Sequence, residues 1–174
     1  EKYEESVIYL NKVITIDPMY MDALNDKGWI LSRLKKHEES IACLNKALEI
    51  EPNNISSWHN MHLALANQKK HEESIACLNK ALEIEPNNSL LLNSKSWTLC
   101  KLERYEEALL LSEIVLTMNH PKAEYIHTKG FILLKLKQYQ DAIKWFDKAL
   151  AVDPNHKDSI KDRQLAVDAA KLDK

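Results

Sequence analysis

Glycine is almost absent from this chain: two of its 174 residues are glycine and five are proline. A protein built from β-strands needs turn residues at short intervals, and glycine serves many of those turns. The scarcity of glycine therefore argues against a sheet and favours helices joined by short, defined corners. We expect an all-α fold.

Charge of one sign and long apolar runs are lacking as well. The 24 basic and 26 acidic residues give a net charge of −2, whereas a nucleic-acid-binding surface requires a clear excess of Lys and Arg. No apolar stretch approaches the roughly 18 residues that a membrane-spanning helix needs. We expect neither nucleic acid nor a membrane as a partner.

The three cysteines are odd in number and lack the spacing of a disulfide framework. Cys43 and Cys77 occupy the same place in two copies of a repeated segment, so stacking of the copies would hold them too far apart to bridge. We therefore expect reduced thiols and a cytoplasmic protein.

The motifs of catalysis are missing too. The chain has no glycine-rich phosphate loop, no G-x-S-x-G and no H-E-x-x-H. His59 and His62 lie three residues apart on one expected helix, but no third metal ligand stands in register with them. We expect no enzyme, no catalytic residue, no cofactor and no bound metal.

What the chain does contain is a repeat. Residues 35–54 and 69–88 both read KKHEESIACLNKALEIEPNN, at an offset of 34 residues. A fixed period of about 20–50 residues indicates a repeat protein. Acidic residues followed by proline recur at multiples of the same offset, and one His-Pro pair falls a residue late: Asp17-Pro18, Glu51-Pro52, Glu85-Pro86, Asp153-Pro154 and His120-Pro121. The chain therefore holds five versions of one unit, the first of them truncated.

Each unit is expected to form two helices. Within residues 37–50, Ile41, Leu44 and Leu48 recur at helical spacing with charged residues between them. Glu51-Pro52 ends this helix, because the residue before a proline is pushed out of the helical region. A second amphipathic helix is expected over residues 55–68. Neither helix can bury its apolar stripe alone, so successive helix pairs must stack.

The unit resembles the tetratricopeptide repeat, a helix–turn–helix of 34 residues with small residues where the two helices cross. The best match runs through Leu24, Gly28, Leu31, Ser40, Leu44, Ala47 and Pro52. The resemblance implies antiparallel helix pairs stacked into a right-handed superhelix, whose first helices line a concave groove that binds partners. His62 departs from the pattern, because the family has a small residue there. We expect that hairpin to splay or the imidazole to find a partner.

We expect one array over residues 1–174. It would comprise the second helix of a truncated repeat, four full repeats and a capping helix, over residues 1–20, 21–54, 55–88, 89–122, 123–156 and 157–174. The helix over residues 3–16 would lack a first helix to cover it, which leaves self-association within a larger protein as an alternative function. An RNA-binding helical repeat is a further alternative, and the strict 34-residue period and the lack of a basic groove argue against it.

A helical wheel places two series of side chains on the groove face of the first helices. A polar ladder and an apolar ladder recur at 34-residue spacing: Asn25, His59, Asn93 and His127, and Trp29, Leu63, Trp97 and Phe131. The apolar ladder is expected either to wedge between neighbouring first helices or to form a groove floor that contacts a partner. The polar ladder is expected either to be solvated or to bond the backbone of an extended peptide.

A well-known ligand of the family is the acidic C-terminal tail of chaperones, which a clamp of Lys, Asn and Arg holds by its carboxylate. The corresponding places here hold Asn25, Trp29, Asn60, Leu90 and Ser94, and only Asn60 matches. The clamp is therefore absent. Arg33, Lys101 and Lys135 share one place at the rim of the groove. We expect a non-enzymatic scaffold that binds a protein, peptide or helix of another identity in its groove.

Overall fold

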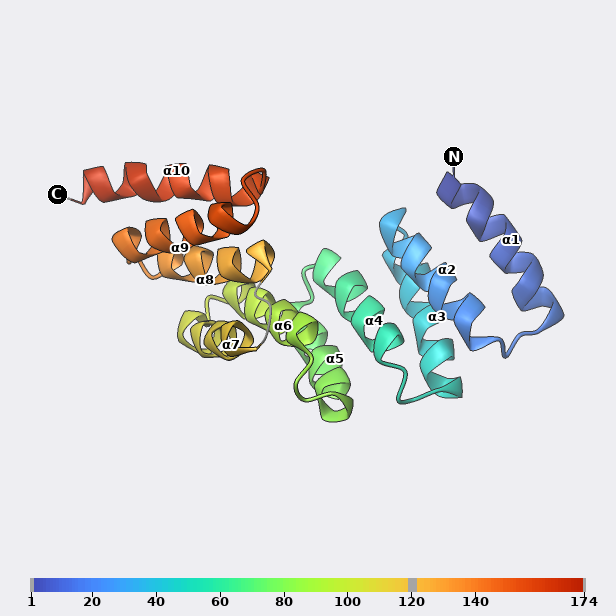
Figure 1. The fold of residues 1–174 in the computed structure, drawn as a ribbon. Coiled ribbons are helices and arrows are strands. Elements are labelled where there is room, and N and C mark those ends of the chain that lie inside the picture. The colour runs from blue at the N-terminus through green and yellow to red at the C-terminus, as the bar shows by residue number, and fades with distance from the viewer. Residues whose placement is uncertain (1, 119–121, 174) are drawn as a thin grey trace. The chain divides into compact units, whose positions relative to one another are not determined.

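The structure is a computed structural model that describes residues 2–118 and 122–173. Within these residues it contains ten α-helices and no strand, as the sequence predicts (Figure 1). The chain divides into two compact units, residues 1–91 and residues 92–174. The predicted His120-Pro121 corner lies outside the described residues.

The first unit contains five helices and the first residues of a sixth. They are α1 (Lys2–Ile16), α2 (Met21–Arg33), α3 (His37–Ile50), α4 (Ile55–Asn67) and α5 (His71–Ile84). The second unit contains the rest of the sixth helix and four more. They are α6 (Ser89–Lys101), α7 (Tyr105–Thr117), α8 (Ala123–Lys135), α9 (Tyr139–Val152) and α10 (Lys157–Leu172). The helix predicted over residues 37–50 has those bounds, and the one predicted over 55–68 ends one residue earlier.

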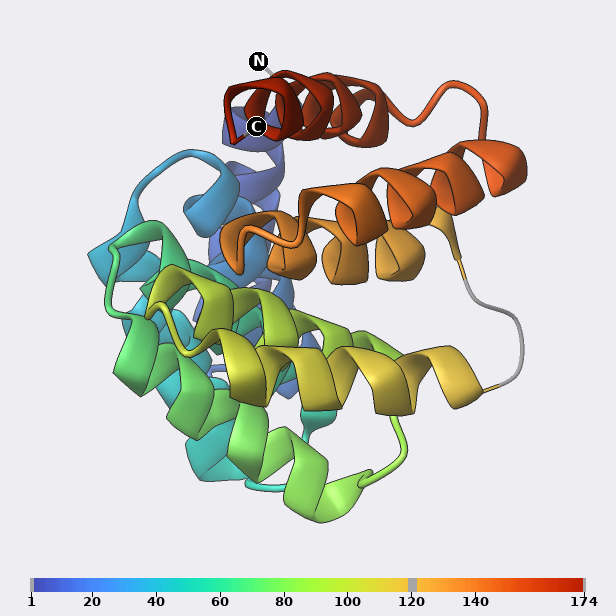
Figure 2. The same cartoon turned by 90° about the vertical axis from the view of Figure 1, so that its left-hand side faces the viewer.

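Stacking follows one rule in both units. The two helices of a hairpin contact each other, as in α2 with α3, α4 with α5 and α8 with α9. The next first helix contacts both members of the pair before it, as α4 does with α2 and α3, and as α10 does with α8 and α9 (Figures 1 and 2). A stripe that one helix cannot bury alone is therefore covered by its own hairpin partner and by the following pair.

Two glycines allow the hairpin helices to approach closely. A Cβ atom built on Gly28 would lie 2.6 Å from Leu44 Cγ, and one on Gly130 would lie 2.8 Å from Phe146 Cδ1. Both Leu44 and Phe146 are completely buried. The first helix of each of these hairpins therefore lies directly against a large side chain of the second.

A serine hydroxyl joins the two helices in three hairpins. Ser40 Oγ donates to the Gly28 carbonyl at 2.6 Å, and Ser96 Oγ donates in the opposite direction, to the Ala108 carbonyl at 2.8 Å. In the hairpin of α4 and α5, His62 Nδ1 lies 2.6 Å from Ser74 Oγ, which lies 3.2 Å from the His62 carbonyl oxygen. A proton on Nδ1 satisfies both contacts, because the imidazole then donates to the hydroxyl and the hydroxyl to the carbonyl. The expectation that the imidazole finds a partner is confirmed.

The corners after the first helices use left-handed backbone without glycine. Four residues at 34-residue spacing have φ near +60°: Lys35 at 61°, Lys69 at 62°, Glu103 at 59° and Lys137 at 61°. Lys35 N donates to the Ser32 carbonyl and Lys36 N to the Leu31 carbonyl, at 3.0 and 2.9 Å. This pair of bonds closes many helices, usually with glycine at the left-handed position. Lysine and glutamate occupy that position here, which is one reason the chain needs so little glycine.

The repeated 14-residue segment HEESIACLNKALEI forms both α3 and α5, in different surroundings. Ile75 in α5 is buried, whereas its copy Ile41 in α3 is half-buried. Leu48 in α3 is buried, whereas its copy Leu82 in α5 is half-buried. The same letters therefore give the same helix, while the neighbouring helices decide which flank of it is covered.

Candidate functional site

In the first unit, the ladder positions of α2 and α4 differ in exposure. Trp29 is 39% exposed and Leu63 is 37% exposed, which is high for side chains of this size. Asn25 and His59 are half-buried. Tyr3 of α1 meets Trp29 edge to face, with ring centroids 5.9 Å apart. The apolar rungs of this unit therefore combine a packing contact with an accessible surface.

Asn25 bonds to the next first helix. Its Oδ1 accepts from Ser57 Oγ at 3.1 Å and from Asn60 Nδ2 at 3.0 Å, and both donors belong to α4. Solvation and peptide binding are the two roles that the sequence predicts for this rung, and the structure adds a third role in joining two repeats. The spacings of 32 and 35 residues between these partners are the sequence signal of this contact.

Replacing Asn25 by alanine is expected to lower the free energy of unfolding by about 1–3 kcal/mol. The change removes one acceptor and leaves two donors unpaired, of which Ser57 is completely buried. Urea unfolding followed by circular dichroism measures the effect. Asn45→Ala on the exposed side of α3 is the matched control, with an expected change within about 0.5 kcal/mol. Equal midpoints for the two variants would contradict a structural role for Asn25.

The histidines of α4 are held neutral by burial. Burial lowers the pKa of His59 below its usual value of 6.5. Burial and, secondarily, the charge of nearby His59 lower the pKa of His62 to about 3. The two rings lie 5.6 Å apart. At neutral pH, His59 therefore offers a partner a neutral imidazole and no positive charge.

In the second unit, the apolar rungs form one aromatic wall. The rings of Trp97 on α6 and Phe131 on α8 lie 4.7 Å apart between centroids, and both side chains are half-buried. Lys101 Nζ lies 4.8 Å from the Trp97 ring centre, and Lys135 Nζ lies 5.2 Å from that of Phe131. Ammonium groups at such distances are attracted to the ring faces. In the first unit, Arg33 lies over Trp29 in the same way, at 5.9 Å.

These cation–aromatic pairs assign a role to the three basic residues that share a place at the rim. Each pair within one helix is spaced four residues apart, which brings two side chains onto the same face of a helix. That spacing is visible in the sequence, so these pairs can be predicted from it. The basic side chains flatten over the aromatic rungs and so contribute to their packing.

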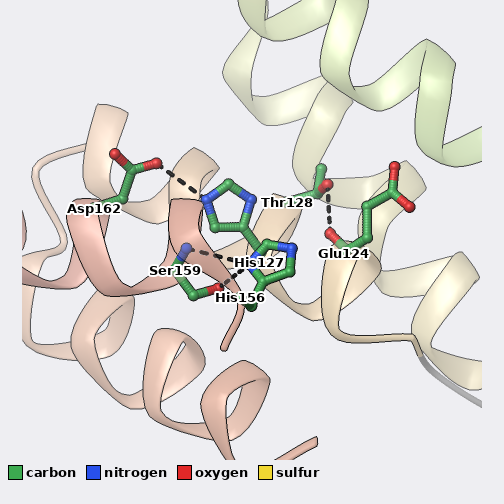
Figure 3. Close-up of polar contacts among 6 residues, drawn as sticks. All are labelled: Glu124, His127, Thr128, His156, Ser159 and Asp162. Atoms are coloured by element: carbon green, nitrogen blue, oxygen red, sulfur yellow. Dashed lines mark hydrogen bonds and ion pairs between the residues drawn. The ribbon is translucent and has the colours of Figure 1, made fainter. Parts of the chain in front are cut away.

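His127 is buried and bonds to the next first helix. Its Nε2 lies 3.0 Å from Asp162 Oδ2 of α10, which is also buried (Figure 3). The carboxylate can only accept, so Nε2 carries the proton and Nδ1 is free to accept. Burial lowers the pKa of His127, although Asp162 acts in the opposite direction. Asp162 was not predicted as a site residue, and it stands 35 residues after His127, the same spacing that links Asn25 to Asn60.

Asn93 is the remaining polar rung. It is 4% exposed, and its buried Oδ1 has no hydrogen-bond partner among the described residues. It lines a cavity of about 180 Å³ bounded by α6, α8 and the start of α10. Trp97, Glu124, His127, Thr128, His156 and Asp158 complete its lining. The structure therefore brings two predicted site residues of α6 and one of α8 together with residues that the sequence analysis did not single out.

Other candidate chemistry is sparse. Within residues 2–118 and 122–173, no three His, Cys, Asp or Glu side chains gather closely enough to hold a metal ion. The three cysteines are free thiols, and burial raises the pKa of Cys77 to about 11 and that of Cys100 to about 12. Thiols with such pKa values are poor nucleophiles at neutral pH. None of the described helices combines the length and apolarity that a membrane crossing demands.

The ends of the chain expose apolar side chains. In α1 no residue is fully buried, and Ile8, Tyr9 and Ile16 are 56%, 66% and 86% exposed. Val7, Leu10 and Ile14 of the same helix are half-buried, and Tyr3 is 39% exposed. In α10 the contacts to α8 and α9 bury Ser159, Asp162 and Ala166, whereas Ile160 and Leu165 are each 51% exposed.

Comparison with known proteins identifies the repeat. Four family models described as tetratricopeptide repeat match residues 22–54, 55–88, 77–109 and 123–156. Together they span more than half of the chain, and the match over 77–109 begins within α5 and ends within α7. In sequence, no curated protein matches the chain.

Solved structures share the fold. MamA from Desulfovibrio magneticus RS-1 has a TM-score of 0.78 at 15% identity, over 89% of this chain and 88% of that one. TTC0263, a thermophilic TPR protein of Thermus thermophilus, has a TM-score of 0.79 at 14% identity, over 95% and 90%. YrrB, described as a TPR protein with an unusual peptide-binding site, has a TM-score of 0.71 at 20% identity, over 93% and 84%. At these identities the likeness shows the fold alone.

Proposed function

Because the chain belongs to the tetratricopeptide repeat family, whose helix pairs typically mediate protein–protein interaction, we propose that it is a non-enzymatic scaffold that binds a partner protein. The bound segment would be a peptide or short helix, held in a groove along the faces of the first helices. The observation that carries this proposal is the exposure of large apolar side chains at one repeated position of those helices.

In each unit the apolar rungs have the character of a contact surface. Trp29 and Leu63 expose more than a third of their area in the first unit, and Trp97 and Phe131 form a half-buried aromatic pair in the second. Accessible apolar side chains gathered on one face usually mark an interaction site, and Trp is enriched among residues that dominate binding energy. The rungs are held in place by packing and by cationic neighbours, so they would meet a partner preorganised.

The polar rungs divide into two groups in this proposal. Asn25 and His127 bond to the next repeat, so their main task is to fix the spacing of the first helices. His59 and Asn93 are the rungs left to bond the backbone of a bound peptide. Burial of both would strengthen such bonds, because water competes less in a site of low dielectric.

The variant Trp97→Ala is expected to weaken partner binding by about 1–3 kcal/mol, the range of an interface hot spot. Isothermal titration with a captured partner measures the loss, and circular dichroism checks that helicity is retained. Leu110→Ala is the matched control, because Leu110 is 63% exposed on α7, away from the ladder positions. If Trp97→Ala unfolds the second unit, Trp97 is a core residue. That result would contradict its role in the proposed binding surface.

The partner is sought by pull-down from a lysate with the parent chain and with a Trp29→Asp/Trp97→Asp variant shown to be folded. A protein captured by the parent and lost by the variant supports binding at the first helices. Capture by both places the site elsewhere on the chain.

Self-association is a second candidate function, favoured by the exposed Ile8, Tyr9 and Ile16 of α1. Capture of an untagged copy of the chain in the same pull-down would support it. A monomer at high concentration in light scattering would remove that support.

A further inference from the structure

One residue that lines a cavity of the second unit carries a buried acceptor that lacks a donor. Asn93 lines this cavity, and its side-chain oxygen Oδ1 is buried and has no hydrogen-bond partner within the described residues. A buried polar atom left unpaired costs about 1–3 kcal/mol, so such atoms are rare in folded proteins. A ligand that brings an N–H group to this oxygen would recover that free energy.

The other polar groups of the cavity also favour a donor. Glu124 and Asp158 contribute two exposed carboxylates to its lining. His127 directs Nε2 to Asp162, which leaves Nδ1 as a further acceptor (Figure 3). His156 Nδ1 accepts from Ser159 N at 3.2 Å. The cavity therefore offers several acceptors and carries negative charge.

An aromatic face completes the lining. Trp97 borders the cavity, and its ring contacts that of Phe131, with the centroids 4.7 Å apart and the planes tilted by 41°. The chain itself shows that this pair attracts a cation, since Lys101 Nζ lies 4.8 Å from the centre of the Trp97 ring. Lys101 does not belong to the residues that line the cavity.

The size of the cavity suits one side chain. Its volume of about 180 Å³ is below the roughly 300–1,000 Å³ of most small-molecule sites. A whole metabolite would not be enclosed, whereas the end of a long, narrow side chain would be. Lysine and arginine have that shape, since a flexible apolar stem ends in a group with several N–H donors.

We propose that the cavity bounded by α6, α8 and the start of α10 binds a lysine or arginine side chain of the partner peptide. This assignment rests on the proposed function, because it names the chemistry of the peptide that the first helices hold. The cationic group bonds to Asn93 Oδ1 and is neutralised by Glu124 and Asp158, and its stem lies against Trp97.

The direct test is an NMR titration of the isotope-labelled chain with Nα-acetyl-lysine methylamide. Saturable shifts of the Asn93 side-chain amide and the Trp97 indole resonances are expected. Nα-acetyl-norleucine methylamide, which has a similar stem and no charge, is the control probe and is expected to leave both resonances unshifted at the same concentration. Equal shifts with the two probes, or no shift with either, would overturn the proposal.

The matched variants separate charge from folding. Glu124→Gln/Asp158→Asn removes two exposed carboxylates, so it is expected to weaken lysine-probe binding by about tenfold without unfolding the unit. Glu38→Gln/Glu49→Gln makes a like change on the exposed side of α3 and is expected to bind like the parent. Unchanged affinity in the first variant would show that the two carboxylates do not contribute to binding, and this would refute the proposal.

Selection of displayed random heptapeptides on the parent chain tells this proposal apart from the proposed function. Selected peptides that contain Lys or Arg and bind weakly to Glu124→Gln/Asp158→Asn support both. Selected peptides that are lost on Trp97→Asp but bind the charge variant normally refute the cation site and leave the scaffold function standing. Binding of the lysine probe with no selected peptide supports the cation site and counts against the scaffold function.

Discussion

Replacing Phe146 by alanine is expected to lower the free energy of unfolding of the second unit by about 3–5 kcal/mol. Phe146 is completely buried, and among the described residues it is the largest side chain that is fully buried. It packs with Leu133, Ala142 and Ala166, so its ring joins α8, α9 and α10. Gly130 lies next to the ring and has no side chain that could fill the space that the truncation leaves.

Urea unfolding followed by circular dichroism measures this effect, with Leu110→Ala as the exposed control and an expected change within about 0.5 kcal/mol. Gly130→Ala provides a second, coupled measurement. A methyl group there would lie 2.8 Å from the ring of Phe146, so Gly130→Ala is expected to destabilise the parent chain. In the Phe146→Ala background the clash is gone. The double variant is therefore expected to lose less unfolding free energy than the two single variants lose in sum. Strict additivity would contradict the contact.

Lowering the pH from 7 to 5 is expected to reduce stability by about 2 kcal/mol through His62 alone. Burial and the charge of His59 lower the pKa of this imidazole from 6.5 to about 3 in the folded state. Below pH 6.5 the His62 imidazole binds a proton in the unfolded chain, whereas in the folded chain it stays unprotonated down to about pH 3. The contribution of the neutral ring is therefore complete above pH 6.5 and falls by about 1.4 kcal/mol per pH unit towards pH 3. Burial lowers the pKa of His59 and His127 as well, and both add in the same direction.

The variant His62→Ser tests the assignment, because α6 carries Ser96 at the same place in its hairpin. Its stability at pH 7 includes the loss of the ring, so the informative quantity is the slope of unfolding free energy against pH. That slope between pH 6 and 4 is expected to be smaller than in the parent by about 1.4 kcal/mol per unit. Equal slopes in the parent and the variant would show that His62 takes up its proton in the same pH range in the folded and the unfolded chain, which would contradict its lowered pKa.

The helices could be predicted from the sequence because neighbouring residues determine where each helix begins and ends. The α3 helix begins after Lys36 and ends before Glu51-Pro52, where the proline excludes helical backbone, and the same letters set the limits of α5. The left-handed corners at Lys35 and Lys69 could not be predicted as easily, since lysine carries no preference for that backbone. These corners recur every 34 residues, so their positions follow the period of the repeat.

The ladder positions could be predicted from the sequence, whereas their contacts could not. The ladder positions follow from helical spacing, and Trp29, Leu63, Trp97 and Phe131 lie at accessible or half-buried places of the first helices. The bond of His127 to Asp162 depends on which turn of α10 meets α8, and a single-helix wheel contains no such information. The same holds for Asn93, whose missing donor becomes apparent only when the neighbouring helices are in place.

The identity of α3 and α5 gives this chain a problem of self-recognition during folding. Leu78 and Ser74 of α5 stand at the places of Leu44 and Ser40 of α3, so α5 would offer α2 an equivalent docking surface during folding. Docking on α5 in place of α3 would close a loop over residues 34–70 instead of residues 34–36. The entropy of the longer loop disfavours that register by on the order of 2 kcal/mol. Chain connectivity, and not side-chain chemistry, thus selects the correct pairing of α2.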